Sequence, residues 1–410
     1  MNWIILVGLT ILGFAALMHD GGHFWQFADL RRSMDLSIAA DDSRLRIEAA
    51  GNIELAPDGS GVTELADGGY LDVTERRNGM DRRVRFEGDD GVIERQFWIG
   101  GDEHPWDADA DRFVAEIMPV VLRETGISAR ERVAWLLENR GDAGLVDEID
   151  LIESDFAQQL FTVLYAESAK IPDALFQRLA TIAENHMGSD FSLRLTLTRL
   201  YETQRPTREN LAALLGAATT IGSDFEARQL LDAVNGGLDT PETVAAFFRV
   251  TDSIGSDFEM RQALAPIVTR RDVADDVVEQ AIATAGRDIG SDFELRIVLG
   301  EAAARVGSSD TLTRSYVTAT DSIGSDFEHK EALLALANRA ELSPAGWRLL
   351  LMSAQSIGGD FECASLLTAV APRLPMDNDG VVAAYRAALD SIGSEFERQR
   401  AAGALVLNTP

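Results

Sequence analysis

The segment Ile254-Gly255-Ser256-Asp257-Phe258-Glu259 is one of eight versions of the same hexapeptide in this 410-residue chain. The phenylalanines of successive copies are separated by 33–35 residues. They occupy positions 156, 191, 225, 258, 293, 327, 361 and 396. A period of this length is typical of stacked two-helix units, as in TPR-like and HEAT-like arrays. The repeat therefore predicts an α-solenoid of about eight helical hairpins over residues 143–407.

The residues around the fourth copy predict a corner between two helices. Apolar residues recur every three or four positions on both sides of the hexapeptide, which indicates one buried stripe on each helix. The stripes are Val244, Phe247, Val250 and Ile254 before it, and Met260, Ala263, Leu264 and Ile267 after it. Gly255 suits the left-handed residue that ends a helix. Ser256 and Glu259 have the spacing of a capping box for the next helix.

Phe258 lies off the second stripe, and we expect it and its equivalents to be buried between successive repeats. Asp257 lies in the first turn, where the helix dipole favours a negative charge. A cation follows that aspartate four residues later in most copies, at Arg194, Arg228, Arg261, Arg296 and Lys330. It could pair with the aspartate of its own helix or bridge to the aspartate of the adjacent repeat. The first and last copies depart from the pattern, as the ends of a capped solenoid require.

Strand patterns dominate residues 37–106. Residues 45–49, 70–75, 83–87 and 92–99 have alternating or strand-rich sequences, and Gly-containing turn signals separate them, including Asn78-Gly79. These features predict a small antiparallel domain of five or six strands with one buried face. A helical pair is expected over 107–142, with helices at 109–125 and 128–139, the second opened by Ser128 and Glu131. The predicted fold class is α+β: a small antiparallel β domain followed by the solenoid.

Composition narrows the functional classes. The net charge of −30 argues against a nucleic-acid surface, because phosphate binding requires clustered Lys and Arg. Hydrophobic residues make up 46% of the chain, enough for a packed interior. Cys363 is the only cysteine, so no internal disulfide can form, and its place on an apolar stripe predicts a buried thiol.

The N-terminus carries the membrane signal. Residues 3–18 (WIILVGLTILGFAALM) form an uncharged run of 16 residues, between the lengths of a signal-peptide core and a spanning helix. We therefore expect residues 1–20 to be a signal or membrane-anchor segment, with most of the chain outside the cytoplasm.

No catalytic, cofactor-binding or metal-binding residue is predicted. His19 and His23 have zincin spacing but lack the glutamate, and two glycines lie between them. Asp107, Asp109 and Asp111 begin like a calcium loop but fail at its later positions, so a helix cap is the better interpretation. No phosphate-binding loop or nucleophile motif is present.

The acids of the hexapeptides are the remaining candidate for a site. They are Asp155, Asp190, Asp224, Asp257, Asp292, Asp326, Asp360 and Glu395. If they faced solvent along one edge, they could bind cations or a basic peptide. Otherwise they are first-turn acids that the Arg series partly neutralises.

The chain resembles a bacterial region of known location. A β domain, the sequence GDEHPWD at 101–107, and repeats of Ser-Asp-Phe followed by Arg resemble the extracytoplasmic C-terminal part of membrane metallopeptidases of the β-lactam-sensor/antirepressor type. The resemblance covers roughly residues 37–407. The chain has no His-Glu-x-x-His motif and no multi-span membrane domain, so the resemblance carries over no catalytic residue. It implies a place in the bacterial cell envelope, anchored to the membrane or secreted to the periplasm.

These patterns together predict a non-enzymatic repeat protein that binds a protein partner, as a sensor or scaffold, and meets the membrane through its N-terminal segment. The alternative is a cation-binding protein or an enzyme that uses the acidic column.

Overall fold

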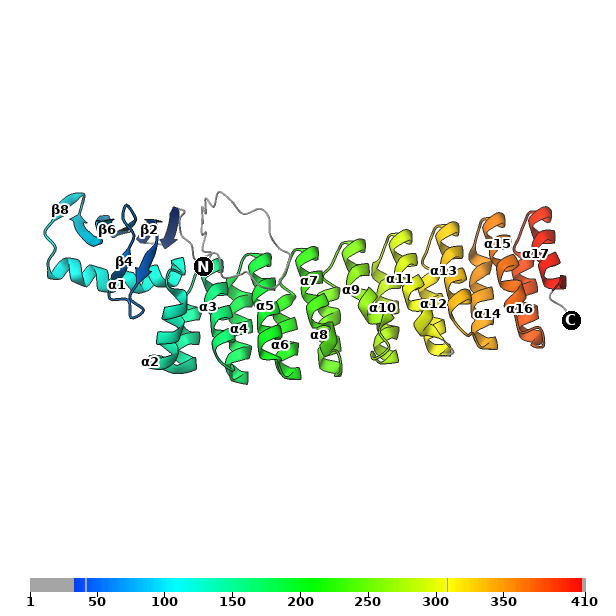
Figure 1. Cartoon of the computed structure of the whole chain (residues 1–410). Coiled ribbons are helices and arrows are strands. Elements are labelled where there is room, and N and C mark those ends of the chain that lie inside the picture. Colours follow the sequence, from blue (N-terminus) through cyan, green and yellow to red (C-terminus); the bar gives the residue numbers. More distant parts are fainter. Residues whose placement is uncertain (1–32, 41–42, 308, 408–410) are drawn as a thin grey trace. The chain divides into compact units, whose positions relative to one another are not determined.

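The computed structural model describes residues 33–40, 43–307 and 309–407, so the predicted N-terminal segment and the His19 and His23 pair lie outside the described residues. Figure 1 shows the order of the elements. The chain divides into two compact units, one ending at Ser192 and the other beginning at Leu193. Among the described residues, no helix is long and apolar enough to cross a membrane.

The first unit contains the predicted antiparallel sheet, which is confirmed. Six strands pair in the order β1-β2-β5-β6-β7-β8, and a separate hairpin, β3-β4, lies between β2 and β5 in the sequence. The strands are β1 (Met34–Ala40), β2 (Ser43–Ala50), β3 (Ile53–Leu55), β4 (Val62–Leu65), β5 (Tyr70–Arg77), β6 (Met80–Asp89), β7 (Val92–Ile99) and β8 (Asp102–His104). The β5–β6 turn is the predicted Asn78-Gly79, with φ of 52° and 79°, as a tight hairpin requires.

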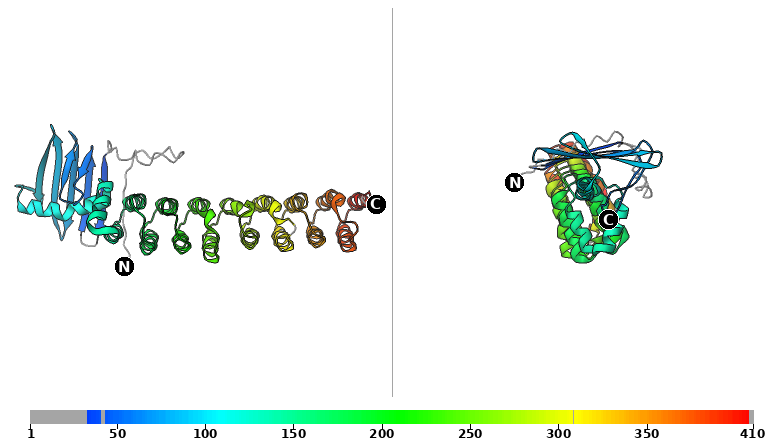
Figure 2. Two further views of the ribbon diagram at one scale, coloured as in Figure 1. Left: turned by 60° about the horizontal axis from the view of Figure 1, so that its bottom comes forward. Right: turned by 90° about the vertical axis from the view of Figure 1, so that its left-hand side faces the viewer.

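Helix α1 (Ala108–Thr125) covers the buried face of the sheet (Figure 2). The register places Ile47 opposite Val73, and Val84 opposite Phe97, on this inner face. Phe113 and Met118 of the helix belong to the same buried cluster. The β domain therefore has one apolar core between sheet and helix.

Asp107 caps α1 as predicted, because its carboxylate accepts hydrogen bonds from the amides of Asp109 and Ala110. The second helix opens after Ser128, as predicted, but the expected capping bond is not made. Ser128 precedes α2 (Ala129–Asp150) in a left-handed conformation and makes no cap bond. Its hydroxyl instead accepts from the amide of Leu55 in strand β3, so a tertiary contact replaces the local one.

Helix α2 bends at Gly141, whose φ of 66° and ψ of −177° are not helical. Its first part holds the buried Arg132, which pairs with the buried Glu148 of its second part at 2.8 Å. The same guanidinium donates to the carbonyl of Pro57 at 2.7 Å. The buried ion pair therefore fastens the bent helix to the β3-β4 connection. Two further helices of this unit, α3 (Asp155–Ser168) and α4 (Asp173–His186), begin the repeats.

The predicted helical repeat solenoid is confirmed. Helix α5 (Asp190–Gln204) spans the division between the units. The second unit continues with α6 (Arg208–Ala218), α7 (Asp224–Val234), α8 (Pro241–Thr251), α9 (Asp257–Thr269), α10 (Asp275–Asp288), α11 (Asp292–Val306), α12 (Asp310–Thr320), α13 (Asp326–Arg339), α14 (Pro344–Ser353), α15 (Asp360–Val370), α16 (Asp379–Asp390) and α17 (Glu395–Leu407). From α7 to α17, odd-numbered helices pack on odd-numbered neighbours, and even-numbered helices pack likewise between α6 and α8 and from α10 to α16. They form two rows, seen nearly end-on in Figure 2.

The apolar stripes predicted around the fourth hexapeptide are buried. The first of its two helices, α8, ends at Thr251, so Ile254 lies in the connection rather than in the helix. Ile254 is nevertheless only 4% exposed, and each of the other seven copies has a buried Ile or Met at this position. This apolar residue, two before the cap position, anchors each corner to the core.

The predicted burial of the phenylalanines was wrong. All eight are exposed, by between 41% and 74% of the side chain's reference area. A position off the main stripe can be covered by a neighbouring repeat or left open, and here it is left open. The space between repeats is filled by the stripe residues and by the corner isoleucines.

We expect substitution of the corner isoleucine to cost far more stability than substitution of the phenylalanine. Ile323→Ala should lower the free energy of unfolding by about 2–5 kcal/mol, because it leaves a cavity in the core. Phe327→Ala should lower it by about 1 kcal/mol or less, since it removes an exposed contact. Urea unfolding of the two variants measures both values, and equal losses would contradict this assignment.

Candidate interaction surface

In seven of the eight hexapeptides a serine caps the helix that follows it, as predicted, and the seventh copy has Gly359 at this position. The hydroxyl of Ser256 accepts the amide of Glu259 at 3.4 Å, and the same bond recurs at six other copies. The returning half of the predicted capping box is absent from α9, because the side chain of Glu259 does not bond the amide of Ser256. That amide donates instead to the preceding repeat.

In six copies the aspartate holds the corner of the next repeat. The two carboxylate oxygens of Asp224 accept the amide of Gly255 at 3.1 Å and the amide of Ser256 at 2.8 Å. We call this contact the carboxylate clamp. It recurs from Asp155 to Gly188 and Ser189, from Asp257 to Gly290, from Asp292 to Gly324 and Ser325, from Asp326 to Gly358, and from Asp360 to Gly393 and Ser394.

The clamp corrects the role predicted for the glycine. Gly255 and the other clamped glycines do not have positive φ, so none of them ends a helix in the left-handed conformation. A Cβ on Gly255 would lie 3.8 Å from the carboxylate of Asp224, an ordinary contact distance. The glycine therefore contributes an exposed backbone amide beside the carboxylate rather than an unusual conformation.

The first copy has the same clamp, made by a residue outside the repeat. It has Glu153 where the other seven copies have glycine. Glu124 near the end of α1 accepts the amides of Glu153 at 3.1 Å and Ser154 at 3.0 Å. Burial of Glu124 raises the pKa of its carboxyl to about 7, against the opposing effect of the two amides. The helix of the β domain thus ends in an acid that takes the place of a preceding repeat.

Four of the repeat arginines pair with the glutamate of the next repeat and not with a hexapeptide aspartate, so both interpretations left open by the sequence were wrong about the acid. Arg228 also pairs with Asp232 of its own helix. The Nε of Arg228 lies 2.8 Å from the carboxylate of Glu259 in the next repeat. Arg194 with Glu226, Arg261 with Glu294, and Arg296 with Glu328 make the same bridge between repeats. The aspartate is unavailable to the cation because it is held by the clamp.

Four of the repeat cations also lie over the phenylalanine of their own helix. Arg228 lies 5.1 Å from the ring centre of Phe225, and Lys330 lies 4.4 Å from that of Phe327. Arg261 and Arg296 stack likewise on Phe258 and Phe293. In the seventh repeat, where Ala364 replaces the cation, Arg400 of the next repeat lies over Phe361. The ring therefore orients the cation for its bridge to the next repeat.

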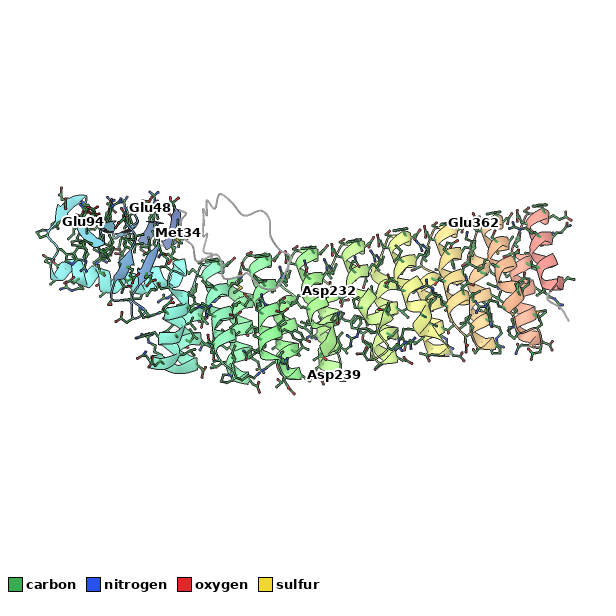
Figure 3. The ribbon with its side chains drawn as sticks, viewed as in Figure 1. Met34, Glu48, Glu94, Asp232, Asp239 and Glu362 are labelled. Atoms are coloured by element: carbon green, nitrogen blue, oxygen red, sulfur yellow. The ribbon has the colours of Figure 1, made fainter. Side chains whose placement is uncertain are left out.

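Six of the phenylalanines lie in the second unit, and we call them the phenylalanine row. They are Phe225, Phe258, Phe293, Phe327, Phe361 and Phe396. Each is the second residue of an odd-numbered helix. The row therefore follows one edge of the array, where these helices begin. Glu362, beside Phe361, marks this edge in Figure 3, and Asp239 lies at the opposite edge. After its contact with a cation, each ring from Phe225 to Phe361 is still 47–54% exposed.

The edge that carries the row is acidic. Between residues 223 and 330, each copy has an aspartate and a glutamate in its first turn but one cation. That cation lies against a ring, and in three of these copies it is also bridged to the glutamate of the next repeat. More carboxylates lie at the ends of the even-numbered helices, at Asp321 and Asp390 and at Asp252 and Asp288, which share the cation of Arg287. The phenylalanines are therefore surrounded by excess negative charge.

The acidic column does not form a cluster that could hold a metal ion within the part of the chain that the structure describes. In four clamps, those of Asp155, Asp224, Asp292 and Asp360, both carboxylate oxygens receive backbone amides. Cys363 is buried as predicted, and burial raises the pKa of its thiol.

Comparison with protein-family models, with curated proteins and with solved structures finds no match. The resemblance to the extracytoplasmic region of sensor metallopeptidases stays a prediction.

The sequence contained a signal for the exposed row that the stripe analysis missed. Phe258 falls off the stripe of α9 and is followed three residues later by an arginine, the spacing at which a cation reaches a ring on the same helix face. A buried ring between repeats would have no need of a charged neighbour.

We expect loss of one clamp to loosen the corner of the following repeat only. Asp292→Ala leaves the amides of Gly324 and Ser325 without their acceptor, and should cost about 1–3 kcal/mol. Hydrogen exchange followed by mass spectrometry should show faster exchange at that corner and unchanged exchange at Gly358, which Asp326 holds. The matched control is Glu341→Ala, at an exposed acid, which should change the free energy of unfolding by less than about 0.5 kcal/mol. Uniform loosening of every corner would contradict a nearest-neighbour clamp.

Glu124 should make stability depend on pH. Its folded pKa of about 7 lies above the ordinary value of 4.5, so the folded state binds the proton more tightly than the unfolded state. Stability from this group is complete below about pH 4.5 and is lost as the pH rises to about 7, by up to about 3 kcal/mol. Urea unfolding between pH 5 and pH 8 should show a smaller decline for Glu124→Gln than for the unmodified chain. An equal decline in both would refute the assignment.

Proposed function

We propose that this chain is a non-enzymatic interaction protein of the bacterial cell envelope that binds a protein partner along the phenylalanine row. The observation that carries the proposal is the regular exposure of six phenylalanines, one per repeat, along one edge of the second unit. A repeated apolar series on a surface is expensive to leave in water and is typical of an interaction site. Aromatic residues are also enriched in protein interfaces.

The role of the rings as supports for the cations does not account for their exposure. An exposed cation–ring contact contributes about 0.5–1 kcal/mol, and an aliphatic chain could orient an arginine without an aromatic face. A repeat array also suits an elongated partner, because its helices present equivalent side chains at a fixed interval.

Attachment to the membrane is the second part of the proposal. It is supported by the uncharged run at residues 3–18, which has the length of a signal or anchor segment. The Ser-Asp-Phe repeats support the same location through their resemblance to an extracytoplasmic region. The chain would then act as a scaffold or sensor whose partner lies at the envelope.

Photo-crosslinking in cells of the source organism tests the interaction. A benzophenone amino acid replaces Phe258, Phe293 or Phe327 in turn, and in the control it replaces Met352, which is 62% exposed on an even-numbered helix. We expect one heterologous adduct from the row positions and none from the control. The adduct should disappear when the two flanking phenylalanines are changed to serine and circular dichroism shows the helices intact.

Three results would refute the proposed interaction. They are the absence of any adduct at the row, the same adducts at the row and at Met352, and an adduct consisting only of a second copy of this chain.

A further inference from the structure

We infer that the phenylalanine row receives a basic, proline-rich segment in the polyproline II conformation, with one residue of every three facing the row. This inference rests on the proposed function and specifies the partner. It follows from the interval of the row, the chemistry of the rings and the charge of the edge.

The interval of the row is the distance between neighbouring odd-numbered helices. These helices pack directly on one another, and the clamp and the Arg228–Glu259 bridge join their first turns. Helices in such contact lie about 8–10 Å apart. One phenylalanine per repeat therefore presents a ring about every 8–10 Å.

A polyproline II segment matches this interval. It has three residues per turn and rises about 3.1 Å per residue, so every third side chain lies on the same face, about 9 Å further along. A β-strand advances about 10 Å in three residues, but side chains three residues apart in a strand point to opposite faces. An α-helix repeats its face at about 5.4 or 10.8 Å, and its bulk would hold most residues away from the rings. The conformation that meets every ring on one face is polyproline II.

The rings suit proline chemically. Proline-rich segments bind to aromatic surfaces because their conformation is already formed and little entropy is lost on binding. The rings of Phe258, Phe293 and Phe327 are 47%, 51% and 52% exposed, so each offers an open surface to one proline. A successive series of such contacts accumulates along the row, as in other repeat arrays.

The charge of the edge decides which proline-rich segment binds. Each copy between residues 223 and 330 has two carboxylates and one cation, and that cation lies against a ring. The whole chain carries a net charge of −30. A segment with a lysine beside each proline that faces a ring would be attracted, and an acidic segment would be repelled. The partner segment is therefore basic, and its binding weakens with salt.

Fluorescence anisotropy with labelled peptides tests this inference on the full chain. The first peptide repeats Pro-Pro-Lys over six triplets. The second has the same composition with the lysines irregularly spaced, and the third repeats Pro-Pro-Glu. We expect the first to bind, the second to bind about fivefold or more weakly, and the third not to bind. The triple variant Phe258→Ser, Phe293→Ser, Phe327→Ser should bind the first peptide about tenfold or more weakly, whereas Met352→Ser should bind it unchanged.

Two binding results would overturn the inference. Equal binding of the first two peptides would show that charge alone is recognised, and equal binding by the triple variant, with its helices intact by circular dichroism, would show that the row is not the site. If none of the peptides binds while the crosslinks at the row persist, the inference is refuted and the proposed function stands. If the Pro-Pro-Lys peptide binds while the crosslinks are absent, the row recognises this segment chemistry and the proposed partner in the cell is refuted.

Discussion

The carboxylate clamp is the interaction on which the repeat array depends. A corner between two helices leaves backbone amides without partners, because the first amides of a helix have no carbonyl to bond within it. Here the aspartate of one repeat supplies both oxygens to the corner amides of the next, as Asp224 does for Gly255 and Ser256. Hydrogen bonds to a charged acceptor are among the stronger ones, each worth about 1.5–3 kcal/mol. The clamp therefore satisfies the corner and joins neighbouring repeats with the same pair of bonds.

The clamp explains why the hexapeptide acts on its neighbours more than on itself. Its serine caps its own helix, but its aspartate holds the following corner and its glutamate receives the arginine of the preceding repeat. Its isoleucine anchors the corner in the core. These contacts complete the interface between repeats without the phenylalanine, whose side chain remains about half exposed at the surface. Five residues of the hexapeptide thus stabilise the array, and the sixth, the phenylalanine, forms the exposed row.

The first unit extends the same principle to a domain of another kind. Glu124 of α1 has the hydrogen-bonding role of a repeat aspartate, although α1 belongs to the core of the β domain. A longer side chain is used, and its carboxylate is buried more deeply than those of the repeats. The buried pair of Arg132 and Glu148 fixes the bent helix that lies between the two kinds of structure. The helix of the β domain therefore supplies the carboxylate that a preceding repeat would otherwise supply to the first corner.

Sequence reasoning succeeded for features that depend on neighbours in the chain. The period, the apolar stripes, the serine caps and the Asn78-Gly79 turn follow from spacing along one helix or one hairpin, where the distance between side chains is set by backbone geometry. It failed for the glycine, the phenylalanine and the partners of the charges. The left-handed conformation predicted for Gly255 was one of several ways to end a helix, and the clamp selected another.

The chain by itself determined that identical corners recur, which helix each serine begins and which faces are apolar. Only the tertiary structure decided which carboxylate holds which amide, which acid receives each arginine and whether the rings are covered. The physical reason lies in the repetition. When every copy carries the same acid, cation and ring, spacing cannot distinguish a partner within one repeat from its equivalent in the next. That choice is made by the way the helices pack.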